Sequence, residues 1–463
     1  MKALKMKFAA AAAFCAQHEK AMQLAFFALC AVYYFIHAVK LPYNGGADEA
    51  MRYLVPVYIY DHNALPTGWE ESVRNAYWGF SYAFYPTLLP SILGTLCMKI
   101  CRIFTGDGFA LLVAARVVDV LSGAGAVYFV LKLLTRIVKR PWNWMAAVFM
   151  ALIPQYAHVS SYFNNDMPAV FGISMILCAW VYAALDGWNV KNSLLLTAGI
   201  IVVGLSYYNA YSWVLMSAVF FLGTQEKGIF AKGEEGKKKR RNALKCMLLI
   251  VGISAVCILP LFIRNIVVNG DLLGMKTVAA STAIYGDKDF YATLPTTYQA
   301  QGRTVLDMLS DGSCYFIKKV LLSFFGAFGY SKVFIPYKYL GVYMTFIMLG
   351  IFGFIFALLN AGVNKEPLLG DSGLRGRKAG MLMVCASAAS MISAGLAIWY
   401  SYASDYQPQG RYYYPVLPAM MLMIAIGYKM VGKHPRLLRL FACVTMIAMM
   451  YEAYFHALVY LVD

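Results

Sequence analysis

Residues 109–131 read FALLVAARVVDVLSGAGAVYFVL, an apolar run interrupted by only two charges, Arg116 and Asp119. About 20 consecutive residues of this kind cross the hydrocarbon core of a bilayer as an α-helix. Comparable runs recur along the 463-residue chain, which is 61% hydrophobic and 14% charged. Soluble domains carry about 25% charged residues. The sequence therefore predicts an all-α polytopic membrane protein and excludes a soluble enzyme or a nucleic-acid-binding factor.

Eleven membrane spans are predicted, and the basic residues orient them. The spans are placed at 21–39, 109–131, 142–161, 168–185, 193–207, 209–224, 246–263, 338–360, 379–399, 414–431 and 440–460. Lys and Arg accumulate on the cytoplasmic side of membrane proteins. The basic stretches 132–140 and 226–245 both fall on that side only if the apolar run 84–104 does not cross. We therefore expect the N-terminus on the cytoplasmic side, where a short lead-in precedes the first span. We expect 84–104 to form an amphipathic helix on the outer surface.

We expect one transmembrane domain over residues 1–463, because no repeat or independent soluble domain is visible. Its first extracytoplasmic loop covers 40–108 and contains juxtamembrane helices. A basic cytoplasmic loop covers 225–245, and a second long extracytoplasmic loop covers 264–337. The net charge of +17 is read as an orientation signal and a contact for anionic lipid.

An acidic pair, Asp48-Glu49, directly follows the first span, and Arg52 comes one helical turn after Asp48. If this segment is helical, Asp48 and Arg52 share a face. A carboxylate beside a guanidinium stays ionised and is then competent as a base, while the arginine offers hydrogen-bond donors to a phosphate oxygen. A solvated surface pair after a turn is the alternative at this point.

Asp166 follows the third span, among the aromatic and amide side chains of residues 160–168. Capping of the next helix is the alternative role for this acid, and the two roles can coexist. His158, near the outer end of the same span, is close enough in sequence to reach the site, although a lone histidine there is more often structural.

Two arginines stand where later spans exit on the outer side. Arg411, followed by Tyr412, suits an anionic headgroup and sugar stacking. Arg264 at the end of the seventh span is another candidate for phosphate contact. Interfacial arginines that reach for the membrane surface are the alternative for both.

The predicted orientation brings all these groups to one side at membrane depth. Two acids and several arginines there fit the binding of a lipid-linked phosphate while an acid deprotonates an acceptor hydroxyl or amine. Neither a P-loop nor a GxGxxG motif after a strand is present. Inside the second span, Arg116 and Asp119 lie three residues apart, and mutual neutralisation is the simpler account of that intramembrane pair.

Several short motifs resemble polytopic glycosyltransferases of the GT-C superfamily, in particular bacterial protein O-mannosyltransferase-type and lipid A aminoarabinose transferase-type enzymes and a related uncharacterised bacterial membrane family. The resemblance rests on the stretches Asp48–Tyr53, Tyr85–Leu89, the span with Arg116, Asn165-Asp166, Leu322–Tyr330 and Gln409–Tyr412 leading into Pro415. It implies a GT-C-like bundle in the cytoplasmic membrane that transfers a sugar from a polyprenyl-phosphate-linked donor to an extracytoplasmic glycan, lipid or protein acceptor.

The resemblance also implies roles for particular residues. The expected catalytic residues are Asp48, Asp166 and Glu49. Asp48 matches the first-loop acid that acts as or positions the base, Glu49 completes that acidic pair, and Asp166 matches the second-loop acid. The donor phosphate would be contacted by Arg52, Arg264 and Arg411, and the sugar or acceptor by Tyr53, Asn165 and Tyr412. A single displacement with inversion is expected. A divalent cation between Asp48 and Asp166 stays open, because carboxylate oxygens suit hard cations.

Two other functions stay open: a transporter or flippase of a lipid-linked anion, and a structural membrane protein or glycan polymerase. A transporter would need charged or broken helices near the middle of the membrane, often in repeated halves. Convergence of Asp48, Asp166 and Arg411 on one outer-face cavity would instead favour the transferase.

Overall fold

The computed structural model describes residues 17–226, 229, 232–328, 333–363, 368–431 and 444. Most of this part is helical, and its strands are one short antiparallel pair, β1 (Ala327–Phe328) and β2 (Val333–Phe334), in which Ala327 lies opposite Phe334. The α-helices are α2 (Glu19–Lys40), α3 (Glu49–His62), α4 (Leu89–Arg102), α5 (Gly108–Ile137), α6 (Trp142–Ala151), α7 (Pro154–Val159), α8 (Asp166–Asp186), α9 (Val190–Gly204), α10 (Tyr211–Gly223), α11 (Glu234–Asn269), α12 (Met275–Tyr285), α13 (Lys288–Thr293), α14 (Val305–Phe325), α15 (Tyr337–Val363), α16 (Gly376–Ala403) and α17 (Leu417–Val431). The 3-10 helices are η1 (Glu71–Val73), η2 (Tyr82–Phe84), η3 (Tyr208–Ala210), η4 (Gly370–Ser372) and η5 (Gly410–Val416).

Among the described residues, seven helices are long and apolar enough to cross a membrane. They are α2, α5, α8, α11, α15, α16 and the continuous segment Gly410–Val431 formed by η5 and α17. Each coincides with one of the predicted spans. The prediction of an all-α polytopic membrane protein is therefore confirmed.

The predicted number of eleven spans is not confirmed. The segment 142–161 is divided into α6 and α7, because Pro154 cannot continue the hydrogen-bond pattern of the preceding helix. α9 and α10 are only 15 and 13 residues long. The predicted last span, 440–460, lies outside the described residues except for Val444, as do residues 1–16 of the lead-in.

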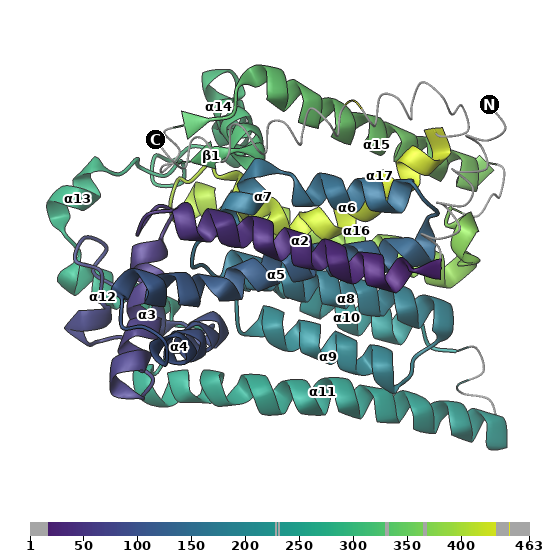
Figure 1. Ribbon diagram of the computed structural model, residues 1–463, viewed down its shortest axis with the longest axis horizontal. Coiled ribbons are helices and arrows are strands. Elements are labelled where there is room, and N and C mark those ends of the chain that lie inside the picture. Colours follow the sequence, from purple (N-terminus) through teal and green to yellow (C-terminus); the bar gives the residue numbers. More distant parts are fainter. Residues whose placement is uncertain are drawn as a thin grey trace.

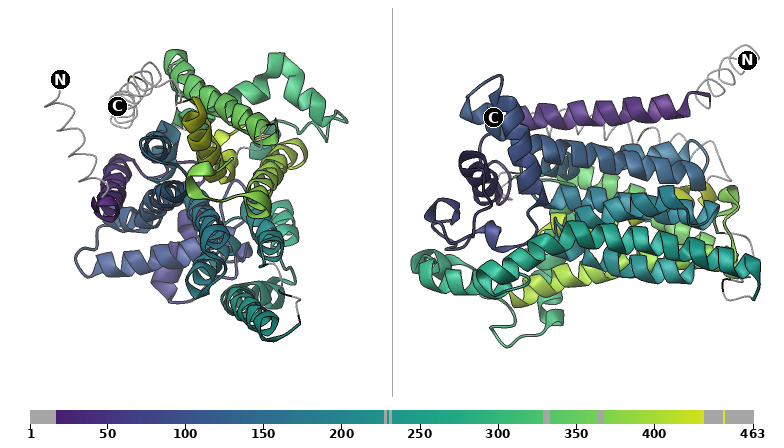
Figure 2. Two further views of the ribbon diagram at one scale, coloured as in Figure 1. Left: turned by 90° about the vertical axis from the view of Figure 1, so that its right-hand side faces the viewer. Right: turned by 90° about the horizontal axis from the view of Figure 1, so that it is seen from below.

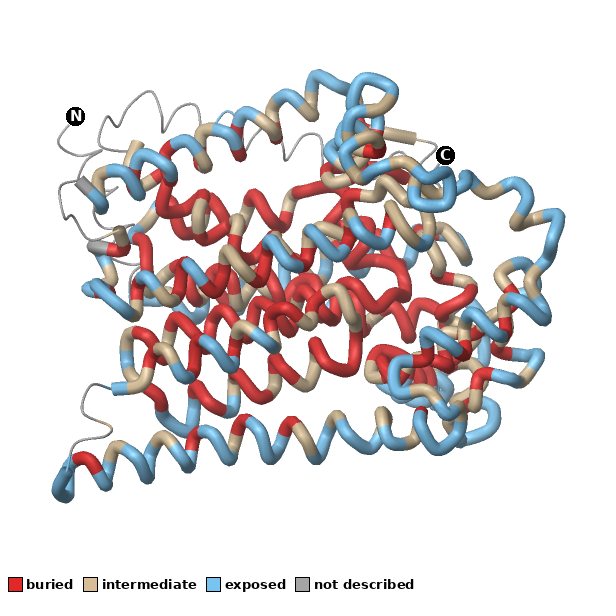
Figure 3. The backbone as a smooth tube through the Cα atoms, turned by 180° about the vertical axis from the view of Figure 1, so that it is seen from behind, coloured by how far each residue is buried: buried red, intermediate tan, exposed pale blue. Residues whose placement is uncertain are grey.

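The long helices lie side by side in one bundle, with α5 and α8 in its interior and α11 and α15 along its margins (Figures 1 and 2). Figure 3 shows buried backbone concentrated in the middle of the bundle and exposed backbone along α11. Beyond Lys245, the exposed side chains of α11 are apolar, for example Val251, Val256 and Val267. Such a surface suits lipid rather than water.

Within the run 84–104 lies the 14-residue helix α4, which is too short to span. α4 packs on α5 and α3 through one face. Its other face exposes Leu96 and Ile100, and Phe104 just beyond its end is 83% exposed. α4 thus has one face packed on the protein and one exposed apolar face, and its place on the outer surface stays a prediction.

One end of the bundle carries α3, α4, α12, α13 and α14, which come from the two long loops (Figure 1). Hydrogen bonds join these loops: Ser281 donates to the carbonyl of Gly79 at 2.7 Å. The second loop also contacts the end of α16, where Gln299 N–H donates to the carbonyl of Tyr402 at 3.2 Å. The second loop therefore ties the first loop to the segment that carries Arg411.

Candidate active site

Asp48 lies in a strained turn at the start of α3. Its φ of 64° is in the left-handed region, which non-glycine residues rarely occupy outside functional or special turns. Gly46 makes this turn feasible, because a Cβ there would lie 2.0 Å from the ring of Tyr162. Asp48 makes no side-chain capping bond to α3. Its carboxylate is thus available to groups from other elements.

Arg411 binds that carboxylate. Its Nη2 lies 2.6 Å from Oδ2 of Asp48, and its Nη1 lies 3.5 Å from Oδ2 of Asp166. Nη1 also donates to the hydroxyl of Tyr162 at 3.3 Å, and Nε donates to Oε1 of Gln409 at 2.8 Å. One guanidinium from η5 therefore connects two acids that lie 118 positions apart in the chain.

Two contacts of the neighbouring residue Gly410 hold Arg411 in place. Gly410 packs directly on α14, since a Cβ there would lie 2.1 Å from the backbone nitrogen of Phe324. Gly410 N–H donates to Oγ of Ser323 at 2.8 Å. The backbone that carries Arg411 is thus fixed against the end of the second long loop.

Asp166 is the first residue of α8 and is 3% exposed. Oδ1 of Asn164 accepts from the N–H groups of Asp166 and Met167 at 2.8 and 3.0 Å. The side chain of Asn164, and not that of Asp166, therefore accepts from the first N–H groups of α8, so the capping role considered for Asp166 is wrong. Oδ1 of Asp166 is buried without a hydrogen-bond partner in the described part of the chain.

Arg52 completes the charged group from α3. Its guanidinium lies 4.2 Å above the centre of the Tyr82 ring, and its buried Nε has no hydrogen-bond partner among the described residues. Burial favours the neutral form, but Tyr82, Asp166 and Asp48 together raise the pKa of Arg52 above its ordinary value. Arg52 is thus a buried cation with unused donor capacity.

The electrostatic balance keeps Asp48 ionised. Burial by itself would raise its pKa, but the charges of Arg411 and Arg52, together with the hydrogen bond from Arg411, hold the pKa of Asp48 below its ordinary value. The carboxylate is still 28% exposed. Asp48 is therefore a charged, partly accessible group, as a proton acceptor at neutral pH must be.

Glu49 lies in a different environment although it is the next residue. Its two carboxylate oxygens each accept from Arg116 at 2.7 Å, and both side chains are 0% exposed. Oε1 also accepts from Phe163 N–H at 2.9 Å. Every contact of this carboxylate is with the protein interior, so the catalytic role expected for Glu49 finds no accessible oxygen here, and that role stays a prediction.

The expected neutralisation of Arg116 by Asp119 is wrong. The remaining N–H groups of Arg116 donate to the backbone carbonyls of residues 38, 41 and 42. Asp119 is fully buried, with Oδ2 accepting from Asn164 N–H at 3.3 Å and Oδ1 without a partner among the described residues. Arg116 instead pairs with Glu49, because the turn after α2 brings this bidentate acceptor to it.

The other expected contact residues make mainly structural contacts. Tyr53 packs against the rings of Tyr43 and Phe163. Asn165 donates to the carbonyls of residues 87 and 206 at 3.1 and 2.9 Å. Arg264 donates to the carbonyls of residues 65 and 66. In the described part of the chain, none of these three forms a hydrogen bond or ion pair with Asp48, Asp166 or Arg411.

Tyr412 does belong to the charged group. Its hydroxyl accepts from Nη2 of Arg411 at 3.2 Å and donates to Gln407. Gln407 in turn donates to Asp405, whose pKa is raised by burial and then by the charge of Asp48. The sequence alone does not assign Tyr162 or Tyr82 to the site. Tyr162 lies in the polar stretch 160–168 that contains Asp166, whereas nothing in the sequence points to Tyr82.

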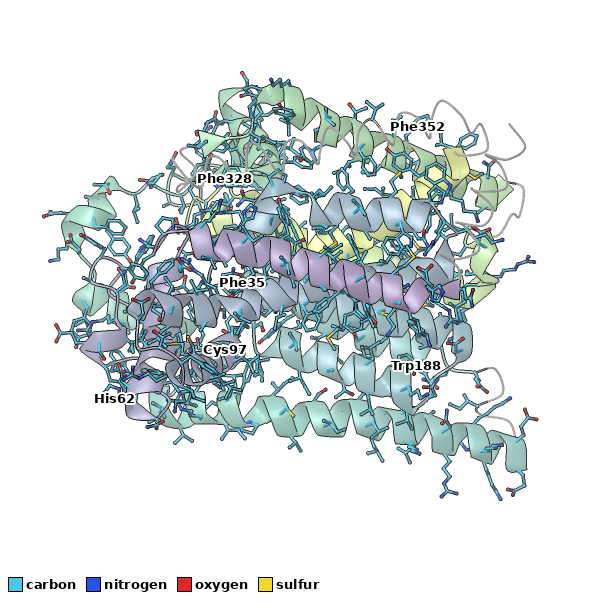
Figure 4. The ribbon with its side chains drawn as sticks, in the orientation of Figure 1. Phe35, His62, Cys97, Trp188, Phe328 and Phe352 are labelled. Carbon is cyan, nitrogen blue, oxygen red and sulfur yellow. The ribbon has the colours of Figure 1, made fainter. Side chains whose placement is uncertain are left out.

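A small cavity of about 80 Å³ adjoins Arg411. We call it the His158 cavity, and it lies where the first loop, α7, the end of α14, β1 and η5 meet. Figure 4 labels Phe328 of β1 at this end of the molecule and Trp188 at the opposite end. The lining residues are Ala47, Gln155, His158, Tyr162, Ser323, Ala327, Gln409, Gly410 and Arg411.

The donor set does not fit a preformed divalent-cation site. Among the described residues, no group of three or more His, Cys, Asp and Glu side chains could hold a metal ion. Hard divalent cations take about six oxygen ligands. The two carboxylates considered as ligands, Asp48 and Asp166, each direct one oxygen to the guanidinium of Arg411. Arg411 thus supplies the positive charge between them.

No protein-family model and no curated protein matches the chain. Solved structures do match. The crystal structure of the oligosaccharyltransferase from Archaeoglobus fulgidus in the apo form aligns with TM-score 0.55 and 15% identity over 95% of this chain. The same organism's oligosaccharyltransferase AglB, in complex with an inhibitory peptide and a dolichol-phosphate, aligns with TM-score 0.54 and 15% identity over 96% of this chain.

In both comparisons this chain spans 56% of the length of the matched protein. The apo crystal structure of ArnT from Cupriavidus metallidurans aligns with TM-score 0.49 and 15% identity, over 89% of this chain and 60% of that one. At such low identity the likeness concerns architecture. The chain therefore shares the fold of the two oligosaccharyltransferase structures.

Proposed function

We propose that this protein is a membrane glycosyltransferase that moves a sugar from a polyprenyl-phosphate-linked donor to an acceptor on the extracytoplasmic side. The observation that carries this proposal is the meeting of Asp48, Asp166 and Arg411, with Arg52 one turn along α3, at one end of a GT-C bundle. A dolichol-phosphate accompanies one of the similar structures, which supports a lipid-linked phosphate as the donor class. Charges gathered at one end favour a transferase over a transporter with charges at mid-membrane.

The orientation of the bundle supports an extracytoplasmic site. Basic side chains at the other end include Arg136, Arg140 and Lys237, which pair with Asp186, Glu19 and Glu234. A basic end faces the cytoplasm under the positive-inside rule. The charged group around Arg411 then lies at the outer face of the cytoplasmic membrane.

Arg52 and Arg411 are the proposed phosphate-binding residues. Arg52 has donor capacity without a protein acceptor, and guanidinium groups bind phosphate oxygens with paired hydrogen bonds. Arg411 already holds two carboxylates, so an arriving phosphate competes with Asp48 for its donors. Binding of the donor would thereby release the Asp48 carboxylate toward the acceptor.

In the proposed step, Asp48 accepts the proton of an acceptor hydroxyl as its oxygen attacks the anomeric carbon of the sugar. The bond from that carbon to the phosphate oxygen breaks, and its electron pair leaves with the phosphate. Arg411 and Arg52 stabilise the growing negative charge. Asp166 positions Arg411, and a single displacement inverts the anomeric configuration.

The test compares Asp48→Asn with Asp61→Asn, an exposed acid near the other end of α3. Both full-length variants are reconstituted in vesicles with a panel of undecaprenyl-phosphate hexoses and a panel of glycan, lipid and peptide acceptors. General bases contribute about 10²–10⁴-fold to rate, so Asp48→Asn is expected to lose at least about 10²-fold while Asp61→Asn keeps the wild-type rate. Movement of the donor across the bilayer without product would instead favour the flippase alternative.

A further inference from the structure

The His158 cavity contains buried polar groups that the proposed transfer step does not use. His158 is 3% exposed, and its Nδ1 has no hydrogen-bond partner among the described residues. Its ring contacts Tyr162 and Phe328 at 5.2 Å between centroids. The ring is therefore held firmly in the wall while one nitrogen remains unsatisfied.

Gln155 supplies a second unused group to the same cavity. Its Oε1 accepts from Ala327 N–H at 2.5 Å, which fixes the amide against β1. Its NH₂ group has no hydrogen-bond acceptor among the described residues. The hydroxyl of Tyr162, which accepts from Arg411, also keeps its proton free to donate. Gln155, His158 and Tyr162 thus all line one small space.

The charges around the cavity argue against an ionic ligand. Arg411 is the only Lys or Arg among the lining residues, and two carboxylates already bind it. No Asp or Glu lines the cavity, so a cation finds no counter-ion. His158 forms no ion pair among the described residues, and a buried imidazolium without a counter-ion is costly. The unused groups are therefore neutral.

An apolar occupant is equally unsuitable, because a buried donor or acceptor left without a partner loses the free energy of its hydration. The matching chemistry is a ligand whose groups both donate and accept hydrogen bonds without charge, which describes the hydroxyls of a sugar ring. The cavity volume of about 80 Å³ exceeds that of one water site, and Arg411 at its wall borders the proposed reaction centre.

We propose that the His158 cavity binds an uncharged sugar ring through its hydroxyl groups, with His158 and Gln155 as the recognising residues. This inference rests on the proposed function, since it assigns the cavity to a substrate of the same site. The ring belongs either to the donor, as the transferred sugar, or to a glycan acceptor. The chemistry recognised is the same in both cases.

The test uses His158→Phe, which keeps a packed ring but removes both nitrogens, and Gln155→Glu, which keeps the acceptor for Ala327 and removes the NH₂ group. His37→Phe is the matched control: His37 is a buried histidine of α2, 1% exposed, that does not line the cavity. All are full-length proteins in nanodiscs. The probes are bare undecaprenyl phosphate, its mannosyl, glucosyl and galactosyl derivatives, and methyl glycosides of the same sugars as acceptors.

If the cavity holds the transferred sugar, both cavity variants bind the preferred glycosylated carrier about tenfold more weakly, while affinity for the bare carrier stays within about twofold. If it holds an acceptor sugar, carrier affinities stay unchanged and the KM for the methyl glycoside rises about tenfold. His37→Phe behaves as wild type in both arms.

The inference is overturned if wild type transfers sugar and His158→Phe and Gln155→Glu match it in every affinity and KM. It is also overturned if the variants weaken binding of the bare carrier equally, which would assign the cavity to phosphate. A wild-type protein that neither prefers a glycosylated carrier nor transfers sugar would overturn the proposed function and this inference with it.

Discussion

Two adjacent acids in the same turn belong to two unlike regions of the molecule. Glu49 is 0% exposed and gives both oxygens to Arg116, which is itself 0% exposed and donates further to three backbone carbonyls. Asp48 is 28% exposed and gives one oxygen to Arg411, which shares its donors with Asp166. The first pair is closed by protein contacts, whereas the second is open to solvent on one side.

The difference separates a pair that builds the turn from one that can react. A buried ion pair with every donor and acceptor satisfied holds the backbone in place, and no hydrogen-bonding capacity is left for a substrate. An ionised carboxylate that is partly exposed, next to a shared guanidinium, can exchange partners when a phosphate arrives. The Glu49–Arg116 pair therefore positions the strained turn that presents Asp48.

Breaking the closed pair should have the largest effect on stability. Arg116→Met leaves Glu49 buried without its cation, and such a change costs about 3–5 kcal/mol of unfolding free energy. Equilibrium unfolding in detergent micelles measures it. The double variant Arg116→Met/Glu49→Gln removes both charges and should recover part of the loss. Equal stability of Arg116→Met and wild type would contradict a structural role for this pair.

The variant Gly46→Ala tests the link between the two regions. We expect it to have the second largest effect on stability. The added methyl would lie 2.0 Å from the ring of Tyr162, which itself binds Arg411, and overpacking of this kind costs about 1–3 kcal/mol. Both transfer rate and stability should fall. Gly108→Ala is the control, because nothing lies within 4 Å of a Cβ there. Wild-type behaviour of both variants would show that the turn is not held by this contact.

The open pair can be weakened without removing its charge. In wild type, Asp48 has a pKa below the ordinary aspartate value. Its ionised form therefore stabilises the fold fully above the ordinary aspartate pKa. This stabilisation is lost as the pH falls through the lowered pKa of Asp48 in the folded protein. Arg411→Lys removes part of the hydrogen bonding to the Asp48 carboxylate, which should raise its pKa. The acid limb of the pH–rate profile should therefore shift to higher pH, by roughly one pH unit at most. An unchanged pH–rate profile would show that the contact with Arg411 does not determine the ionisation of Asp48.

The smallest effect is expected at an ion pair far from both regions. Arg136 and Asp186 lie 2.7 Å apart at the other end of the bundle, with side chains 38% and 43% exposed. Exposed pairs of this kind contribute about 0.2–1 kcal/mol. Asp186→Asn should therefore change unfolding free energy by no more than about 1 kcal/mol and leave the transfer rate unaltered. A loss as large as that of Arg116→Met would remove the distinction between closed and open pairs.

The sequence predicted the membrane class and the seven long spans, because length and hydropathy alone determine whether a helix can cross. It also singled out Asp48, Asp166 and Arg411, which the structure brings into contact; their roles stay proposals. It could not predict that Arg116 pairs with Glu49, 67 positions earlier, rather than with Asp119 on its own helix. Nor could it place Tyr82 over Arg52, since those contacts depend on how the long loops fold across the end of the bundle.

The central claim, that chemistry resides at Asp48 and structure at Glu49, is tested most directly by measuring Asp48→Asn and Glu49→Gln side by side. Transfer rate and unfolding free energy are determined on the same preparations. We predict that Asp48→Asn loses at least about 10²-fold in rate with a smaller loss of stability than Glu49→Gln, whose rate falls only in proportion to its unfolded fraction. Wild-type turnover by folded Asp48→Asn, or loss of turnover by fully folded Glu49→Gln, would contradict the account.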